Sequence, residues 1–386
     1  MKILYVIKAF AEKGGVERVI CDKMNYLANE GHKIAFVTYI QGSHPLAYNL
    51  SPMIDHYDLN TRFFELSKYS FIRRIKEHIK LRSIFKDRLQ SLVNNIQPDI
   101  ILTTTFQFGL TDIITKLRTN AIKLIESHIG FRQILFSEVH KNNKFLSLLS
   151  TIPDYYFLAQ IKKFDALITL TKGDAKEWGK YTQNIIIIPN PVTNYLIEIP
   201  EKTNFNQRII CVGRLAEQKG FDLLILAFNL IKDQCPQWHI DIFGHGEDKE
   251  KLNRMIIEKG LYGRITINPP TSNIYSEYLK SDFLVLSSRH EGYPLVLNEA
   301  MSCGIPCVAF TCKYGPEDAI IHKTNGLLVE NGNIEKMAEA ILWMINHPKE
   351  RINMGKAARE ASELYKKEII MKKWEELFSS HISQSV

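Results

Sequence analysis

The sequence has 386 residues, of which 45% are hydrophobic and 24% are charged, and its formal net charge is +7. This composition is that of an ordinary globular protein, and it excludes a disordered, collagen-like or fibrous chain. At this length we expect two domains. The best apolar run, Leu223–Ile231, is interrupted by Asn229 and is far shorter than the roughly 18 residues of a transmembrane helix, so we do not expect an integral membrane protein.

The chain opens with a short apolar run, Ile3–Ile7, between Lys2 and Lys8. This run is shorter than the roughly 7–15 residues of a signal-peptide core, so we predict a buried first strand and a cytoplasmic protein. There are six cysteines without a CxxC pair, and most lie in apolar contexts, which indicates reduced thiols packed as small hydrophobic groups. They are Cys21, Cys211, Cys235, Cys303, Cys307 and Cys312.

The first half of the chain alternates short apolar segments with segments of helical spacing. The predicted strands are 2–7, 33–40, 99–105, 122–127, 165–170 and 185–189. The clearest helical patterns between them are 15–30 and about 71–95. This alternation is typical of a parallel sheet with helices on both faces.

After Pro189-Asn190-Pro191 a polar stretch, 191–207, predicts a linker. The second half then repeats the alternation. Its predicted strands are 208–212, 238–243, 264–268, 282–287, 305–310 and 326–329, and its predicted helices lie near 220–233, 248–260, 272–280, 294–303 and 333–346. We therefore predict an α/β protein with two doubly wound, Rossmann-like domains, 1–190 and 208–365, facing a cleft. Residues 366–386 predict a final helix that packs back toward the first domain.

The most informative motif is Glu291-Gly292-Tyr293-Pro294-Leu295-Val296-Leu297-Asn298-Glu299, directly after a predicted strand. Pro294 suits the first position of a helix, so the amides of Leu295 and Val296 would form an anion site. Glu291 and Glu299 would flank that anion, which makes sense if they accept hydrogen bonds from neutral hydroxyls of the same ligand. The alternative is that Glu291 merely precedes a helix, where an acid is favourable, and that Glu299 is a solvated acid on the surface.

Other candidates also follow predicted strands. Gly213 and Arg214 end one strand and Lys219 precedes the next helix, so the two cations can converge on one phosphate; surface cations are the alternative. Gly244 begins a Gly-x-Gly turn that either admits a ligand or is a plain tight turn.

In the first domain, Gly14 and Gly15 open a helix and could bring backbone amides to a phosphate, although strand-to-helix geometry explains such a turn equally well. His128 ends a strand, and a lone histidine is commonly structural.

Several signatures are absent. There is no GxxxxGK[ST] motif, no complete dinucleotide fingerprint, and no HExxH or Asp-x-Asp pair. Kinase-like and NAD-dependent functions therefore lose support, and we expect neither a cofactor nor a metal.

These motifs, in this order, resemble the retaining glycosyltransferases of family 4, which have the GT-B fold. The resemblance covers nearly the whole chain. It implies that Arg214 and Lys219 hold the donor diphosphate, that Glu299 binds ribose hydroxyls, and that Glu291 and the amides after it contact the transferred sugar. It places His128 near the reacting sugar, acting through its side chain or its backbone carbonyl. One departure is Asp318 in the loop 315–320, where similar members have Glu.

The resemblance implies metal-independent transfer of a hexose or N-acetylhexosamine from a nucleotide diphosphate sugar, with UDP favoured, to a hydroxyl of a lipid-linked or surface glycan. The alternatives are a non-catalytic nucleotide-sugar or polyanion binding protein, and a GT-B phosphorylase or epimerase. Loss of Arg214, Lys219 or Glu299 would favour the first of these alternatives, and all three residues are present.

The positive charge is concentrated between Arg62 and Arg88, where nine basic residues face three acidic ones. Apolar residues from Phe71 onward alternate with these cations, as in a basic helix at an anionic lipid surface. We expect peripheral attachment to the inner face of the membrane; the alternative is a solvated helix that packs on its own sheet. Nucleic-acid binding is not expected, because neither a sheet with interleaved aromatics nor a groove-reading helix is evident.

Overall fold

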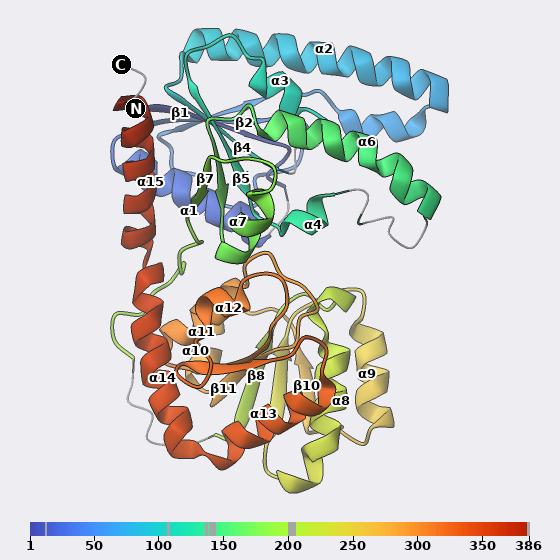
Figure 1. Cartoon of the computed structure of the whole chain (residues 1–386), viewed down its shortest axis with the longest axis vertical. Helices are drawn as coiled ribbons and strands as arrows, with labels where there is room; N and C mark the ends of the chain where they lie inside the picture. The colour runs from blue at the N-terminus through green and yellow to red at the C-terminus, as the bar shows by residue number, and fades with distance from the viewer. Residues whose placement is uncertain (12–13, 106–108, 136–137, 139–143, 200–205, 384–386) are drawn as a thin grey trace. The chain divides into compact units, whose positions relative to one another are not determined.

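In a computed structural model the chain forms two compact units (Figure 1). The structure describes residues 1–11, 14–105, 109–135, 138, 144–199 and 206–383. The first unit comprises 1–170, 174–188 and 371–386, and the second comprises 171–173 and 189–370.

The first unit is built on a seven-stranded parallel sheet with the order β3-β2-β1-β4-β5-β6-β7. Its strands are β1 (Lys2–Ile7), β2 (Lys33–Thr38), β3 (Ile54–Asp58), β4 (Ile100–Thr104), β5 (Ile122–Ser127), β6 (Ala166–Thr169) and β7 (Ile185–Ile187). The six predicted strands are confirmed. The sequence analysis missed β3, because this edge strand has four exposed residues and no apolar pattern.

The helices of this unit lie in the chain between the strands. They are α1 (Gly15–Asn29), α2 (Phe71–Ile96), α3 (Thr111–Thr115), α4 (Phe131–Ile134), α6 (Lys144–Ile161) and α7 (Lys172–Trp178). The final helix, α15 (Lys367–Ser383), belongs to the first unit from Met371 onward. The two helices predicted here, 15–30 and 71–95, are confirmed. None of the helices in the described ranges is both long and apolar enough to cross a membrane.

The second unit has a six-stranded parallel sheet with the order β10-β9-β8-β11-β12-β13. Its strands are β8 (Arg208–Val212), β9 (His239–Phe243), β10 (Ile265–Asn268), β11 (Phe283–Leu286), β12 (Cys307–Phe310) and β13 (Gly326–Val329). All six were predicted. Its helices are α8 (Phe221–Ile231), α9 (Lys249–Glu258), α10 (Ile274–Leu279), α11 (Leu295–Ser302), α12 (Pro316–Ala319), α13 (Ile334–Asn346) and α14 (Pro348–Ser362).

The sequence analysis missed α14 for a physical reason. Its buried face includes Arg351, Gly355 and Ser362, so the apolar period is broken. Arg351 is 3% exposed and donates to the carbonyl of Met344, which lies at the end of α13. The cysteine prediction holds, since all six thiols are free and buried.

The two sheets share a feature that fixes where a ligand binds. In each sheet the strand order reverses at one point, between β1 and β4 in the first unit and between β8 and β11 in the second. In open parallel sheets, ligands bind beyond the carboxyl ends of the strands at this reversal. In the second unit this position is formed by the loops after β8 and β11.

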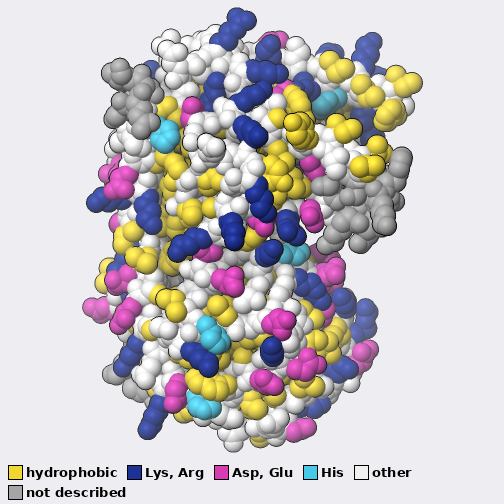
Figure 2. All heavy atoms as spheres, in the orientation of Figure 1, with side chains coloured by type: hydrophobic (Ala, Val, Ile, Leu, Met, Phe, Trp, Pro, Cys, Tyr) yellow, Lys and Arg dark blue, Asp and Glu magenta, His cyan; other side chains and the backbone are white. Residues whose placement is uncertain are grey.

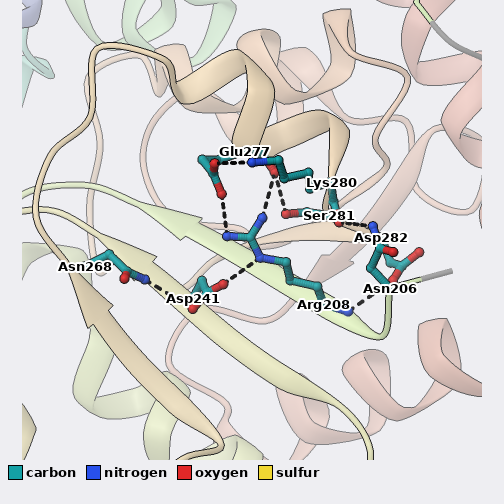
Figure 3. A network of polar contacts seen from close by, with 8 residues as sticks. All are labelled: Asn206, Arg208, Asp241, Asn268, Glu277, Lys280, Ser281 and Asp282. Carbon is teal, nitrogen blue, oxygen red and sulfur yellow. Dashed lines mark hydrogen bonds and ion pairs between the residues drawn. The ribbon is translucent and has the colours of Figure 1, made fainter.

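An ion-pair network lies across the sheet of the second unit, and it begins at the amino end of β8 (Figure 3). The Arg208 guanidinium is 2.5 Å from Asp241 in β9 and 2.6 Å from Glu277 in α10. Asn268 donates to the other oxygen of Asp241 at 3.1 Å, and Lys280 is 2.9 Å from Glu277. One arginine thus joins two strands to a helix.

We expect Arg208→Met to destabilise the second unit by about 2–4 kcal/mol, because two largely buried carboxylates would lose their shared cation. Chemical denaturation measures this loss. The control is Lys336→Met, which removes an exposed ion pair to Glu330 and should cost under about 1 kcal/mol. Equal losses in the two variants would show that the Arg208 network contributes little.

Candidate active site

The loops that follow β8 and β11 are bonded to each other. The Ser287 hydroxyl donates to the Lys219 carbonyl at 3.0 Å, and the Arg289 amide donates to the Gln218 carbonyl at 2.8 Å. The motif residues around Lys219 and Glu291, which are about 70 positions apart in the sequence, therefore lie together at the strand reversal.

Glycines allow the backbones of neighbouring loops to approach each other closely. A Cβ on Gly244 would overlap the carbonyl oxygen of Gly213, and one on Gly220 would overlap that of Ser287. Gly220 also has a φ of +61°, which L side chains rarely adopt. The sequence analysis allowed for Gly244 either as a ligand approach or as a tight turn; the close approach seen here is between two loops of the same unit.

The central polar contact of the site joins Lys219 to Glu291. The Lys219 ammonium is 2.7 Å from Glu291 Oε1, and the Ser288 hydroxyl donates to the same oxygen at 2.6 Å. Glu291 is 5% exposed, and the Lys219 side chain runs along the backbone of Gly213. Arg214 is exposed, and no ion pair to it forms within the described residues. Sequence reasoning missed the Lys219–Glu291 pair because nothing in either motif refers to the other.

The second glutamate of the motif is held from another element. Glu299 lies in α11, is 8% exposed, and accepts a hydrogen bond from the Tyr278 hydroxyl at 3.0 Å. Burial and the neighbouring Glu299 charge raise the pKa of Tyr278 well above its usual value, so this hydroxyl stays a donor. The arrangement leaves a buried carboxylate where α10 and α11 meet.

The start of α11 has the geometry of an anion site. The helix begins at Leu295, and Pro294 is the residue just before it rather than its first residue, a shift of one position from our prediction. The amides of Leu295 and Val296 lie in the first turn, where no carbonyl of the helix can accept from them. Gly292 and Tyr293 precede this turn, and the Asn298 amide donates to the Tyr293 hydroxyl.

Asp318, which stands where similar members of the family have Glu, makes two hydrogen bonds in this structure. The Asp318 carboxylate accepts from the backbone amide of Lys172 at 3.0 Å, and the Tyr365 hydroxyl donates to the Asp318 carbonyl at 3.3 Å. This loop therefore secures residues 171–173 to the rest of the second unit.

Three predicted site residues belong to the first unit. Gly14 is the residue before α1 and Gly15 is its first residue. The Glu17 carboxylate folds back over Gly14, so this turn already faces a negative side chain. His128 follows β5 and is 6% exposed, and its Nε2 lies 3.1 Å from Glu126 Oε2.

Sequence reasoning missed two charged residues beside His128. Lys23 in α1 is 1% exposed and lies 2.5 Å from Glu126 Oε2. A signal was available, because Lys23 lies four residues after Val19 and three after Ile20, on the apolar face of its helix. A lysine at such a position is buried and needs a partner.

Two doubly wound parallel sheets, each with one reversal of strand order, are the architecture of the GT-B glycosyltransferases. Comparison with known proteins agrees. Residues 13–193 match the family described as "Glycosyltransferase Family 4", and residues 197–361 match "Glycosyl transferases group 1". An uncharacterized glycosyltransferase of Haemophilus influenzae is 30% identical over 97% of this chain and 98% of its own. The chain belongs to the GT-B glycosyltransferases and is a glycosyltransferase enzyme.

Two further proteins are informative. The lipopolysaccharide 1,6-galactosyltransferase of Salmonella typhimurium is 26% identical over 87% of each chain. The structure of a mutant of S. aureus TarM in complex with Fondaparinux, alpha-GlcNAc-glycerol and UDP covers 98% of this chain and 100% of its own, at 18% identity and a TM-score of 0.74. At that identity the likeness is one of fold.

Proposed function

We propose that the protein transfers a hexose or N-acetylhexosamine from a UDP-sugar to a hydroxyl of a lipid-linked or surface glycan, with retention at the anomeric carbon. One observation carries the proposal: at the strand reversal the Lys219 ammonium pairs with the buried Glu291, which shortly precedes the first-turn amides of α11, and Arg214 follows the end of β8 in the same loop as Lys219. Positive groups suit a diphosphate, and the carboxylates suit the hydroxyls on either side of it.

The chemistry follows from this distribution of charge. The bond between the sugar C1 and the diphosphate oxygen breaks, and a bond from the acceptor oxygen to C1 forms on the same face. The acceptor proton passes to the departing phosphate oxygen, so no protein base is required. Arg214, Lys219 and the α11 amides stabilise the charge that develops on the leaving group. His128 orients the sugar. Because these groups provide the positive charge, the proposal includes no metal.

The two glutamates take different partners. Glu299 in α11 is held by Tyr278 of α10 and binds the ribose hydroxyls, whereas Glu291 is paired with Lys219 and faces the transferred sugar. The choice of donor and acceptor is supported by the similar proteins: TarM is described with UDP and alpha-GlcNAc-glycerol, and the Salmonella protein is named a lipopolysaccharide 1,6-galactosyltransferase. We also propose that Gly14 and Gly15 approach the donor from the first unit.

The first test is release of UDP from UDP-sugars by the purified protein, with Arg214→Ala and Lys219→Ala alongside. Each variant removes one charged donor from the leaving group, so turnover should fall about 10²–10³-fold while the fold is retained. Arg254→Ala, an exposed cation in α9, is the control and should keep full activity.

The same assay includes excess EDTA, in which wild-type activity should persist. Near-normal turnover in both site variants, or activity lost in EDTA and restored by manganese or magnesium, would refute the charge-stabilisation scheme. Turnover that requires inorganic phosphate and no nucleotide would favour a phosphorylase. Binding of UDP-sugar without any release would favour a non-catalytic protein.

We further propose that the acceptor is presented at an anionic membrane on the inner face of the cell, with the first unit docking there. In α2 only Phe85, Leu89 and Val93 are buried, all in its second half. Four apolar residues of its first half are 48–82% exposed, and so are five large hydrophobic residues of α6. They are Phe71, Ile72, Ile75, Ile79, Leu148, Leu149, Ile152, Tyr155 and Tyr156. Figure 2 shows hydrophobic side chains gathered beside Lys and Arg over the end of the unit where Figure 1 draws the starts of α2 and α6.

This docking surface should bind vesicles of anionic phospholipid at low salt and release them at high salt, because each basic residue near anionic lipid contributes about 1 kcal/mol. The measurement is co-sedimentation. Arg73→Glu/Arg74→Glu/Lys80→Glu should abolish binding. The control with the same change in charge, Lys249→Glu/Lys251→Glu/Arg254→Glu in α9, should not. A wild type that ignores anionic vesicles, or a triple variant that binds them equally well, would make a soluble acceptor the better hypothesis.

A further inference from the structure

We propose that Lys23 and Glu126 form a buried positioning pair that fixes the ring of His128 and the nitrogen on which it carries its proton. This inference rests on the proposed function, because it assigns the pair to the reaction rather than to folding alone. The three residues come from separate places in the first unit: α1, β5 and the loop just after β5.

The geometry converges on one oxygen atom. Glu126 Oε2 lies 2.5 Å from the Lys23 ammonium and 3.1 Å from His128 Nε2. The contact to His128 has hydrogen-bond distance but not full hydrogen-bond alignment. The three side chains are between 1% and 4% exposed, so water does not compete for this oxygen.

The stability of the fold is a poor explanation for the presence of such a buried ion pair. Removing a lysine and a glutamate from water is costly for each ion, and apolar residues of the same size commonly stabilise the fold equally well. Burial lowers the pKa of Lys23 from its usual value. Burial alone would raise the pKa of Glu126. The interactions with Lys23 and His128 outweigh this effect and lower the pKa to about 2. Glu126 is thus an anion held in the core beside a histidine at the carboxyl edge of the sheet.

The carboxylate decides which ring nitrogen of His128 donates. A neutral histidine has one N–H, and it is placed on the nitrogen that faces an acceptor. Nε2 faces Glu126 and therefore carries the proton. Nδ1 is then the acceptor, and it is a buried atom without a hydrogen-bond partner among the residues described. A substrate hydroxyl is a group that this nitrogen is suited to accept from.

Aromatic rings close the pair off from solvent. The Lys23 ammonium lies 3.7 Å from the ring centroid of Trp374 in α15 and 5.6 Å from that of Tyr5 in β1. Trp374 is 4% exposed. A cation on an aromatic face gains electrostatic energy, so the final helix helps to hold Lys23 toward Glu126.

The test compares Glu126→Gln with Asp112→Asn in steady-state sugar transfer. Both changes convert a buried, cation-paired carboxylate of the first unit into an amide; Asp112 pairs with Arg82 at 2.7 Å. Loss of an outer partner of a functional histidine commonly costs about 10–100-fold. We expect Glu126→Gln to lower kcat by that factor with the KM for the donor nearly unchanged, and Asp112→Asn to leave kcat within about twofold.

A double-mutant cycle shows whether Glu126 acts through His128. Glu126→Gln introduced into His128→Ala should produce no further loss of kcat. A second variant, Lys23→Met/Glu126→Gln, removes both buried charges. It should regain the stability lost by either single change, while its kcat stays as low as that of Glu126→Gln.

Independent losses from Glu126→Gln and His128→Ala, or full kcat in the double variant, would overturn the inference and leave the pair a structural feature. Failure of the proposed function is distinguishable, because then the wild type itself would transfer no sugar and release no nucleotide. A wild type that transfers sugar with His128→Ala fully active would also overturn the inference.

Discussion

The organising constraint of the second unit is the placement of a lysine against a buried glutamate at the point where the strand order reverses. Lys219 and Glu291 are 2.7 Å apart, and the loops that carry them meet through backbone contacts that only glycine permits. Each charge in this pair offsets part of the free-energy cost of burying the other. In the proposed function the pair also supplies a cation for the diphosphate and a carboxylate for the sugar hydroxyls, so one contact would serve the fold and the chemistry.

The first unit also contains a buried lysine–glutamate pair. Lys23 and Glu126 also form a buried pair at the carboxyl edge of a parallel sheet, and their shared oxygen faces His128. In both units a charge kept out of water is directed at a loop that follows a strand. Such groups interact more strongly with a ligand than exposed charges do, because the surrounding medium screens them less.

Much of this architecture could be predicted from the sequence. Alternation of apolar and helical segments predicted twelve of the strands, because a buried parallel strand is a continuous apolar run. It missed β3, which is an edge strand with exposed residues, and α14, whose buried face contains Arg351. The motif residues of the second unit were predicted, and two of them, Lys219 and Glu291, lie together. The partners Lys23, Glu126 and Tyr278 were not, because they belong to no motif and their roles depend on contacts between distant segments.

The most direct test of the account is calorimetric titration of UDP into the wild type, Glu299→Gln and Glu291→Gln. Glu299 is assigned to the ribose, so Glu299→Gln should weaken UDP binding by about tenfold, as expected when a charged acceptor becomes neutral. Glu291 is assigned to the sugar that UDP lacks, and its removal frees Lys219, so Glu291→Gln should bind UDP at least as tightly as the wild type. Unchanged affinity in Glu299→Gln, or a comparable loss in Glu291→Gln, would contradict the assignment of the two carboxylates.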